Sequence, residues 1–149
     1  MKASFSKRVL IFILAVLLVF PTLSACGRKI NLNDAKYTMG KFFTAIGEGD
    51  YTAAARLMHV STGITAYNVE SYLASVEKKV GASFADGITN IRYTSYKELP
   101  YNGVPGGSKF RVWGTMNIGN AKDLPFIISL IMDGDGYGIN VVDIDGVDL

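Results

Sequence analysis

The spacing of apolar residues changes once along this chain, near Ile88, and that change limits the folds open to it. Before Ile88, apolar residues recur every three or four positions, as they do along one face of an α-helix. After it, apolar and polar residues alternate, as they do along a β-strand with one buried face. Helices followed by consecutive strands predict an α+β domain in which the helices pack on one face of an antiparallel sheet.

Three helices are expected, over about 34–46, 51–58 and 68–80. Asn33 or Asp34 can cap the first helix, and Asp50 can cap the second. Gly47 and Gly81 are suitable stops for the first and third helices. The apolar stripe of the first helix consists of Ala35, Met39, Phe42, Phe43 and Ile46.

Four strands are expected after the change, over about 88–98, 109–118, 124–132 and 137–144. The segment 99–107 is rich in Pro and Gly and predicts a turn, and Asp133-Gly134-Asp135-Gly136 predicts a tight hairpin. The sequence therefore predicts about three helices followed by four strands.

The amino-terminal segment has the order of an export signal. Lys2, Lys7 and Arg8 precede an unbroken apolar run from Val9 to Phe20, which is 12 residues long. A bilayer span needs about 20 apolar residues, so the run has the length of a secretory signal peptide. An uncleaved signal anchor is the alternative.

The residues that follow this run, Leu23-Ser24-Ala25-Cys26, resemble the bacterial lipobox. The resemblance implies that residues 1–25 are cleaved and that Cys26 carries a diacylglyceryl group. An ordinary secreted protein with a chance cysteine is the alternative. The expected organisation is a signal peptide over 1–25, a lipidated tether over 26–33 and a domain over 34–149. The domain would then lie in the cell envelope, on the outer side of the cytoplasmic membrane or in the outer membrane facing the periplasm.

Charge and cysteine content narrow the possible functions. Without Lys2, Lys7 and Arg8, the 15 basic residues fall to 12 against 13 acidic ones, a net charge of about −1. This balance does not favour nucleic-acid binding. One Cys and one His do not suffice for the usual structural zinc sites, and we expect neither a metal nor a cofactor.

The segment Lys41-Phe42-Phe43-Thr44-Ala45-Ile46, the junction Gly47-Glu48-Gly49-Asp50-Tyr51 and the run Ala53–Met58 resemble the nuclear-transport-factor-2-like (cystatin-like, SnoaL-like) superfamily. The hairpin from Ile127 to Ile144, with Tyr137 after its turn, is similar to the end of that domain. The resemblance implies a curved sheet wrapped around a long helix to form a cone. Some relatives are isomerases or dehydratases, whereas others bind ligands, dimerise or act as accessory domains.

Few residues suggest a catalytic or metal-binding role. Tyr37, Tyr72 and Tyr93 could face the cone as hydrogen-bond donors, but no Asp or Glu falls clearly on a core-facing strand position. His59 could act as a general base, or it could interact with the last carbonyls of the second helix. The segment Asp133–Gly138 matches only part of a calcium loop, and a hairpin turn explains it better.

The strand 124–132 is apolar on both faces, so Ile127 and Ile131 are expected to point away from the helices. With Trp113 and Tyr96 they would form an apolar patch on the outer face of the sheet, which would suit a homodimer or another protein partner. The expected function is a lipid-anchored extracytoplasmic binding or accessory domain that acts through protein contact or a small apolar ligand. A pocket enzyme of the isomerase or dehydratase type and a purely structural or immunity lipoprotein are the alternatives.

Overall fold

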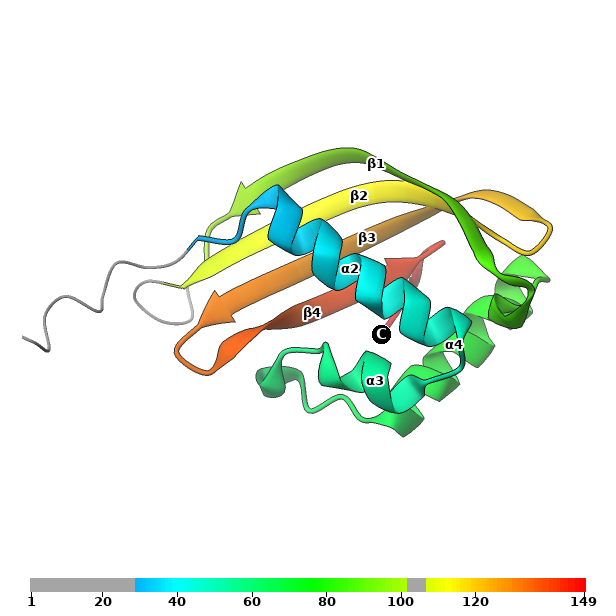
Figure 1. The fold of residues 1–149 in the computed structure, drawn as a ribbon, viewed down its shortest axis with the longest axis horizontal. Coiled ribbons are helices and arrows are strands. Elements are labelled where there is room, and N and C mark those ends of the chain that lie inside the picture. The colour runs from blue at the N-terminus through cyan, green and yellow to red at the C-terminus, as the bar shows by residue number, and fades with distance from the viewer. Residues whose placement is uncertain (1–28, 102–106) are drawn as a thin grey trace, which may run out of the picture.

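The computed structural model describes residues 29–101 and 107–149. There, three α-helices precede a curved antiparallel sheet, which confirms the α+β class and the order of elements (Figure 1). The helices are α2 (Leu32–Gly47), α3 (Tyr51–Arg56) and α4 (Ala66–Val80), with the 3₁₀ turns η2 (Val60–Thr62) and η3 (Phe84–Asp86). The strands, in spatial order, are β1 (Ile88–Leu99), β2 (Ser108–Ile118), β3 (Ala121–Asp133), β4 (Gly136–Ile144) and β5 (Val147–Asp148).

The folded domain begins earlier than the sequence pattern predicts. Ile30 is 5% exposed and packs in the core, and its N–H donates to Ser108 Oγ at 3.2 Å. Asn31, rather than Asn33 or Asp34, caps α2, since its side-chain oxygen accepts from the Asp34 amide at 3.0 Å. Residues 30–33, which were expected in the tether over 26–33, therefore belong to the folded domain. Burial of Ile30 selects Asn31 from several residues that could serve as the cap.

Side-chain caps also set the limits of the other helices. Asp50 caps α3 as expected, and its carboxylate accepts from the Ala53 amide at 2.8 Å. Helix α4 begins two residues before the expected start, because Thr65 and Asn68 form a reciprocal capping box. It ends at Gly81, which has a left-handed φ of 70°.

The sheet is a meander in which each strand pairs with the next along the chain. Its register is interrupted at several points, including between Tyr93 and Ser95 of β1 and between Ser129 and Leu130 of β3. Such irregularities bend strands and increase their twist, which accounts for the curvature in Figure 1. The fifth strand, β5, was not expected, because two residues are too few to show an alternating pattern.

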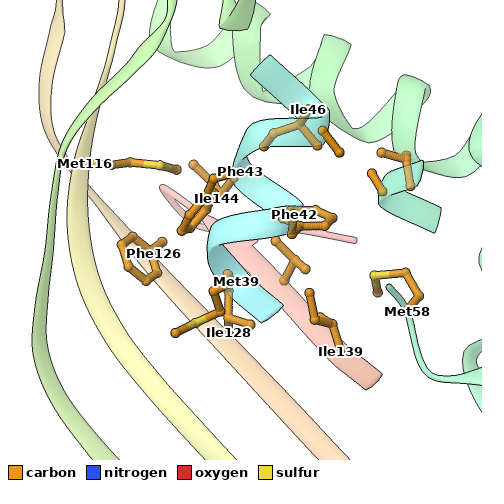
Figure 2. Packing of buried hydrophobic residues seen from close by; sticks show 14 of the residues in the cluster. Met39, Phe42, Phe43, Ile46, Met58, Met116, Phe126, Ile128, Ile139 and Ile144 are labelled. Carbon is orange, nitrogen blue, oxygen red and sulfur yellow. The ribbon is translucent and has the colours of Figure 1, made fainter. Parts of the chain in front are cut away.

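The core lies between α2 and the concave face of the sheet (Figure 2). The expected core face of β2 is confirmed, since its members are all buried: Phe110, Val112, Gly114, Met116 and Ile118. Phe126, Ile128 and Leu130 of β3 face the same side and are at most 1% exposed. Met39, Phe42, Phe43 and Ile46 of α2 fill the space opposite them. The apolar stripe of α2 therefore occupies much of the inside of the cone.

The chain between α3 and η2 covers part of the free edge of β4. The Ile139 amide donates to Leu57 O at 2.9 Å, and the His59 amide donates to Ile139 O at 2.7 Å. Gly138 permits this approach, because a Cβ there would lie 2.6 Å from the His59 nitrogen. Among the described helices, none combines the length and the apolar character needed to cross a bilayer.

Candidate functional site

The outer face of the sheet contains part of the expected apolar patch. Trp113 of β2 lies directly opposite Ile127 of β3, and both side chains are partly exposed. The Arg111 guanidinium lies 5.9 Å from the centre of the Trp113 ring, and its Nε donates to Ser129 Oγ at 2.9 Å. These contacts hold Trp113 and Arg111 together on this face.

Two of the four residues expected in the patch do not contribute exposed surface there. Ile131 has the outward register but is only 3% exposed. Tyr96 lies opposite Val112, on the helix side of the sheet, and stacks on Phe110 at 5.8 Å. An irregularity between Tyr93 and Ser95 shifts the alternation of β1, which explains why the pattern in the sequence assigned Tyr96 to the wrong face.

The three tyrosines expected to face the cone have different surroundings. Tyr72 is 5% exposed, its hydroxyl has no hydrogen-bond partner among the described residues, and burial raises its pKa. Tyr93 packs edge-on against Phe126 at 6.1 Å, with Lys36 Nζ 5.1 Å from its ring centre. Tyr37 is 66% exposed, so the expectation that it points inward is wrong.

The described interior contains few buried polar residues. The polar residues buried in the described part of the chain are Thr38, His59, Ser108, Asn117 and Ser129. Thr38 and Ser108 lie on the helix side of the sheet and bring only hydroxyl groups. An isomerase of the ketosteroid type needs a carboxylate base beside its oxyanion donors. Neither Thr38 nor Ser108 can act as such a base.

The structure also brings together a polar cluster that the sequence does not reveal. His59 Nε2 lies 3.1 Å from Asp133 Oδ1, and the two side chains are 1% and 6% exposed. The Tyr101 hydroxyl donates to Asp133 Oδ2 at 2.6 Å, and Ser61 Oγ lies 2.7 Å from His59 Nδ1. His59 thus contacts a carboxylate on the hairpin 74 residues away, not the last carbonyls of a helix.

Ser61, His59 and Asp133 share the residue types of a catalytic triad, but the backbone around them argues against nucleophilic catalysis. The Ser61 amide donates to His59 Nδ1 at 3.2 Å, and the Thr62 amide donates to His59 O at 2.9 Å. A serine nucleophile needs free donors beside it to stabilise an oxyanion, and both of these are occupied. Nδ1 of His59 accepts from the Ser61 amide, and Nε2 is the ring nitrogen that faces Asp133. We interpret the cluster as a clamp between η2 and the β3–β4 hairpin.

Replacing Asp133 by Asn should make stability less sensitive to acid. The hydrogen bond from Tyr101, the Asp135 amide and His59 all lower the pKa of Asp133. Since folding lowers this pKa, the stabilisation is fully present above the unfolded value of about 4 and is lost as pH falls through the folded value. Urea midpoints measured from about pH 7 to 2.5 should therefore fall more steeply for the wild type than for Asp133→Asn. Asp86→Asn, at the other end of the sheet, is the control, and parallel curves for wild type and Asp133→Asn would contradict the clamp.

Two adjoining cavities form a cleft along the exposed side of α2. One has a volume of about 560 Å³ and lies between α2 and α3, and the other, of about 340 Å³, extends to the β3–β4 hairpin. Tyr37, Lys41 and Leu57 line both. In the smaller cavity, Thr38 Oγ1 donates to the Tyr137 hydroxyl at 3.1 Å. Burial raises the pKa of this hydroxyl, which stays protonated at neutral pH.

The described residues contain no group of three or more His, Cys, Asp or Glu side chains placed to hold a metal ion. Cys26, the expected lipidation site, lies outside the described residues. The hairpin turn expected at Asp133–Gly136 is confirmed, since Asp133 and Gly136 pair at the ends of β3 and β4. The carboxylate of Asp133 is used by Tyr101, His59 and the Asp135 amide.

Neither the known protein-family models nor the curated protein sequences include a match to this chain. The fold class is therefore established by the structure itself. Membership of the nuclear-transport-factor-2-like superfamily remains a hypothesis based on the residues quoted above.

Proposed function

We propose that this protein is a lipid-anchored extracytoplasmic binding domain of the nuclear-transport-factor-2-like type that pairs with a second copy of itself through the outer face of its sheet. The observation that carries the proposal is the direct opposition of Trp113 and Ile127 on that face, both partly exposed. Tryptophan and arginine are the residue types that most often dominate the energetics of protein interfaces. Helix α2 lies across the opposite, concave face (Figure 1).

The charges on this face favour a second copy as the partner. Lys109 and Arg111 lie on β2, whereas Asp143 of β4 lies opposite Ile127, on the other side of β3. In a face-to-face dimer whose two-fold axis runs parallel to the strands, β2 of one copy lies over β4 of the other. That arrangement brings the basic residues of each copy toward Asp143 of its partner, and the self-complementarity suits an isologous dimer.

Trp113→Asp should weaken self-association by at least about thirtyfold, because loss of a central interface residue commonly costs 2 kcal/mol or more. The measurement is light scattering across a concentration series on a chain that begins at Gly27, since the described core begins only at Ile30. Ser71→Asp adds the same charge on exposed α4 and should leave association unchanged. A wild type that is monomeric at all concentrations would overturn the dimer.

A further inference from the structure

The cleft along α2 is lined by cationic side chains. Lys41 and Arg56 line the smaller cavity, and neither forms a salt bridge within the described part of the chain. Lys41 Nζ lies 4.3 Å from the centre of the Tyr37 ring, which orients the ammonium group without neutralising it. Two cations beside exposed tyrosines suit an anionic group carried on an apolar body.

Three acidic residues line the cleft, and two of them already have hydrogen-bond partners. Asp34 accepts from the Asn31 side-chain amide at 2.7 Å, and Asp50 caps α3. Glu48, the third, lines only the larger cavity. The smaller cavity therefore has two cations against one acidic group, and an anion is expected there.

The position of the cleft along the chain places it near the proposed anchor. Ile30, the first buried residue described, follows Cys26 by four residues. Helix α2 then starts at Leu32, and Lys41 lies in its middle. Even with a fully extended tether, Lys41 stays within about 35 Å of the lipidated cysteine. Tyrosine, lysine and arginine are also the side chains that favour the boundary between bilayer and water.

We propose that the smaller cavity of this cleft binds the phosphate headgroup of an anionic lipid in the membrane to which the chain is anchored. The inference rests on the proposed lipidation of Cys26. Lys41 and Arg56 bind the phosphate, Tyr37 and Tyr137 lie against the glycerol and upper acyl region, and the hydroxyl of Tyr137 donates a hydrogen bond. Binding turns a domain on a short tether into one with a fixed orientation on the bilayer.

The test uses the full chain, labelled with 3-fluorotyrosine and placed in nanodiscs of phosphatidylcholine with increasing phosphatidylglycerol. We expect the fluorine resonances of Tyr37 and Tyr137 to shift with the phosphatidylglycerol fraction, while that of Tyr67 on α4, which lines neither cavity, stays in place. The double variant Lys41→Gln/Arg56→Gln should weaken the lipid preference about thirtyfold, because each cation near an anionic surface contributes about fivefold. Lys78→Gln/Lys122→Gln removes the same charge from exposed positions elsewhere and should behave as the wild type.

Four outcomes would overturn the inference. They are no shift at Tyr37 and Tyr137, an equal shift at Tyr67, a shift that persists in Lys41→Gln/Arg56→Gln, and a response to added inorganic phosphate without any response to phosphatidylglycerol. The intact mass of the same sample keeps the two proposals separate. A bare Cys26 refutes the anchor, whereas a diacylated Cys26 without a tyrosine shift refutes only the lipid site.

Discussion

Phe126→Ala should lower the free energy of unfolding by about 3–5 kcal/mol, as truncation of a fully buried aromatic side chain commonly does. Phe126 is 1% exposed and lies on the sheet side of the core, next to helix α2, in Figure 2. Its ring meets Phe43 of α2 edge-on at 5.3 Å and Tyr93 of β1 at 6.1 Å. Truncation therefore removes contacts that connect the helix to two strands.

The position of Gly114 adds to this expectation. A Cβ at Gly114 would clash with the Phe126 ring and with the carbonyl oxygen of Arg92, so the ring occupies space that only glycine leaves free. Because the backbone of β2 forms one wall of this space, the cavity left by alanine cannot close easily. The loss is a large fraction of the 5–15 kcal/mol that typically stabilises a domain.

Urea unfolding of the chain that begins at Gly27 measures this change as a lower midpoint with an unchanged slope. Ile127→Ala is the matched control, because Ile127 is the next residue of β3 but faces outward and is partly exposed. At protein concentrations at which the proposed dimer is dissociated, this substitution should cost less than about 1 kcal/mol. Similar losses for the two variants would mean that β3 has the opposite register.

Cys26→Ala should abolish lipid labelling and release the protein from the membrane. Each buried CH₂ group contributes about 0.8 kcal/mol to membrane binding, and two acyl chains are enough for stable anchoring. The apolar segment Val9–Phe20 is shorter than the roughly 20 residues of a bilayer-spanning helix. We therefore expect the membrane-bound fraction to fall from nearly all of the protein to a minor part of it.

Labelled fatty acid and membrane fractionation measure the two parts of this prediction. Ser24→Ala is the control, because it keeps a small residue before Cys26 and should leave labelling intact. A Cys26→Ala variant that stays on the membrane without label would identify the apolar run as an uncleaved anchor. Label that persists in Cys26→Ala would exclude Cys26 as the acceptor.

The candidate sites depended on information that local sequence does not contain. The opposition of Trp113 and Ile127 followed from alternation along two regular strands, so it could be anticipated. The position of Tyr96 on the helix side of the sheet could not be anticipated, because an irregularity between Tyr93 and Ser95 changes which residues of β1 face the helices. The contact between His59 and Asp133 joins segments 74 residues apart, and no local pattern connects them. The cleft likewise depends on how α3 and the β3–β4 hairpin meet α2.

The order of helices and strands and the inward face of β2 and β3 were determined by the sequence alone, because helical and strand periodicities depend only on neighbouring residues. The tertiary structure decided where the domain begins, since burial of Ile30 selects Asn31 as the cap of α2. It also decided which polar groups meet at the hairpin and which cations line the cleft between α2 and α3. Those outcomes depend on strand irregularities and on contacts between segments distant in the chain. The spacing of apolar residues within one segment carries no information about either.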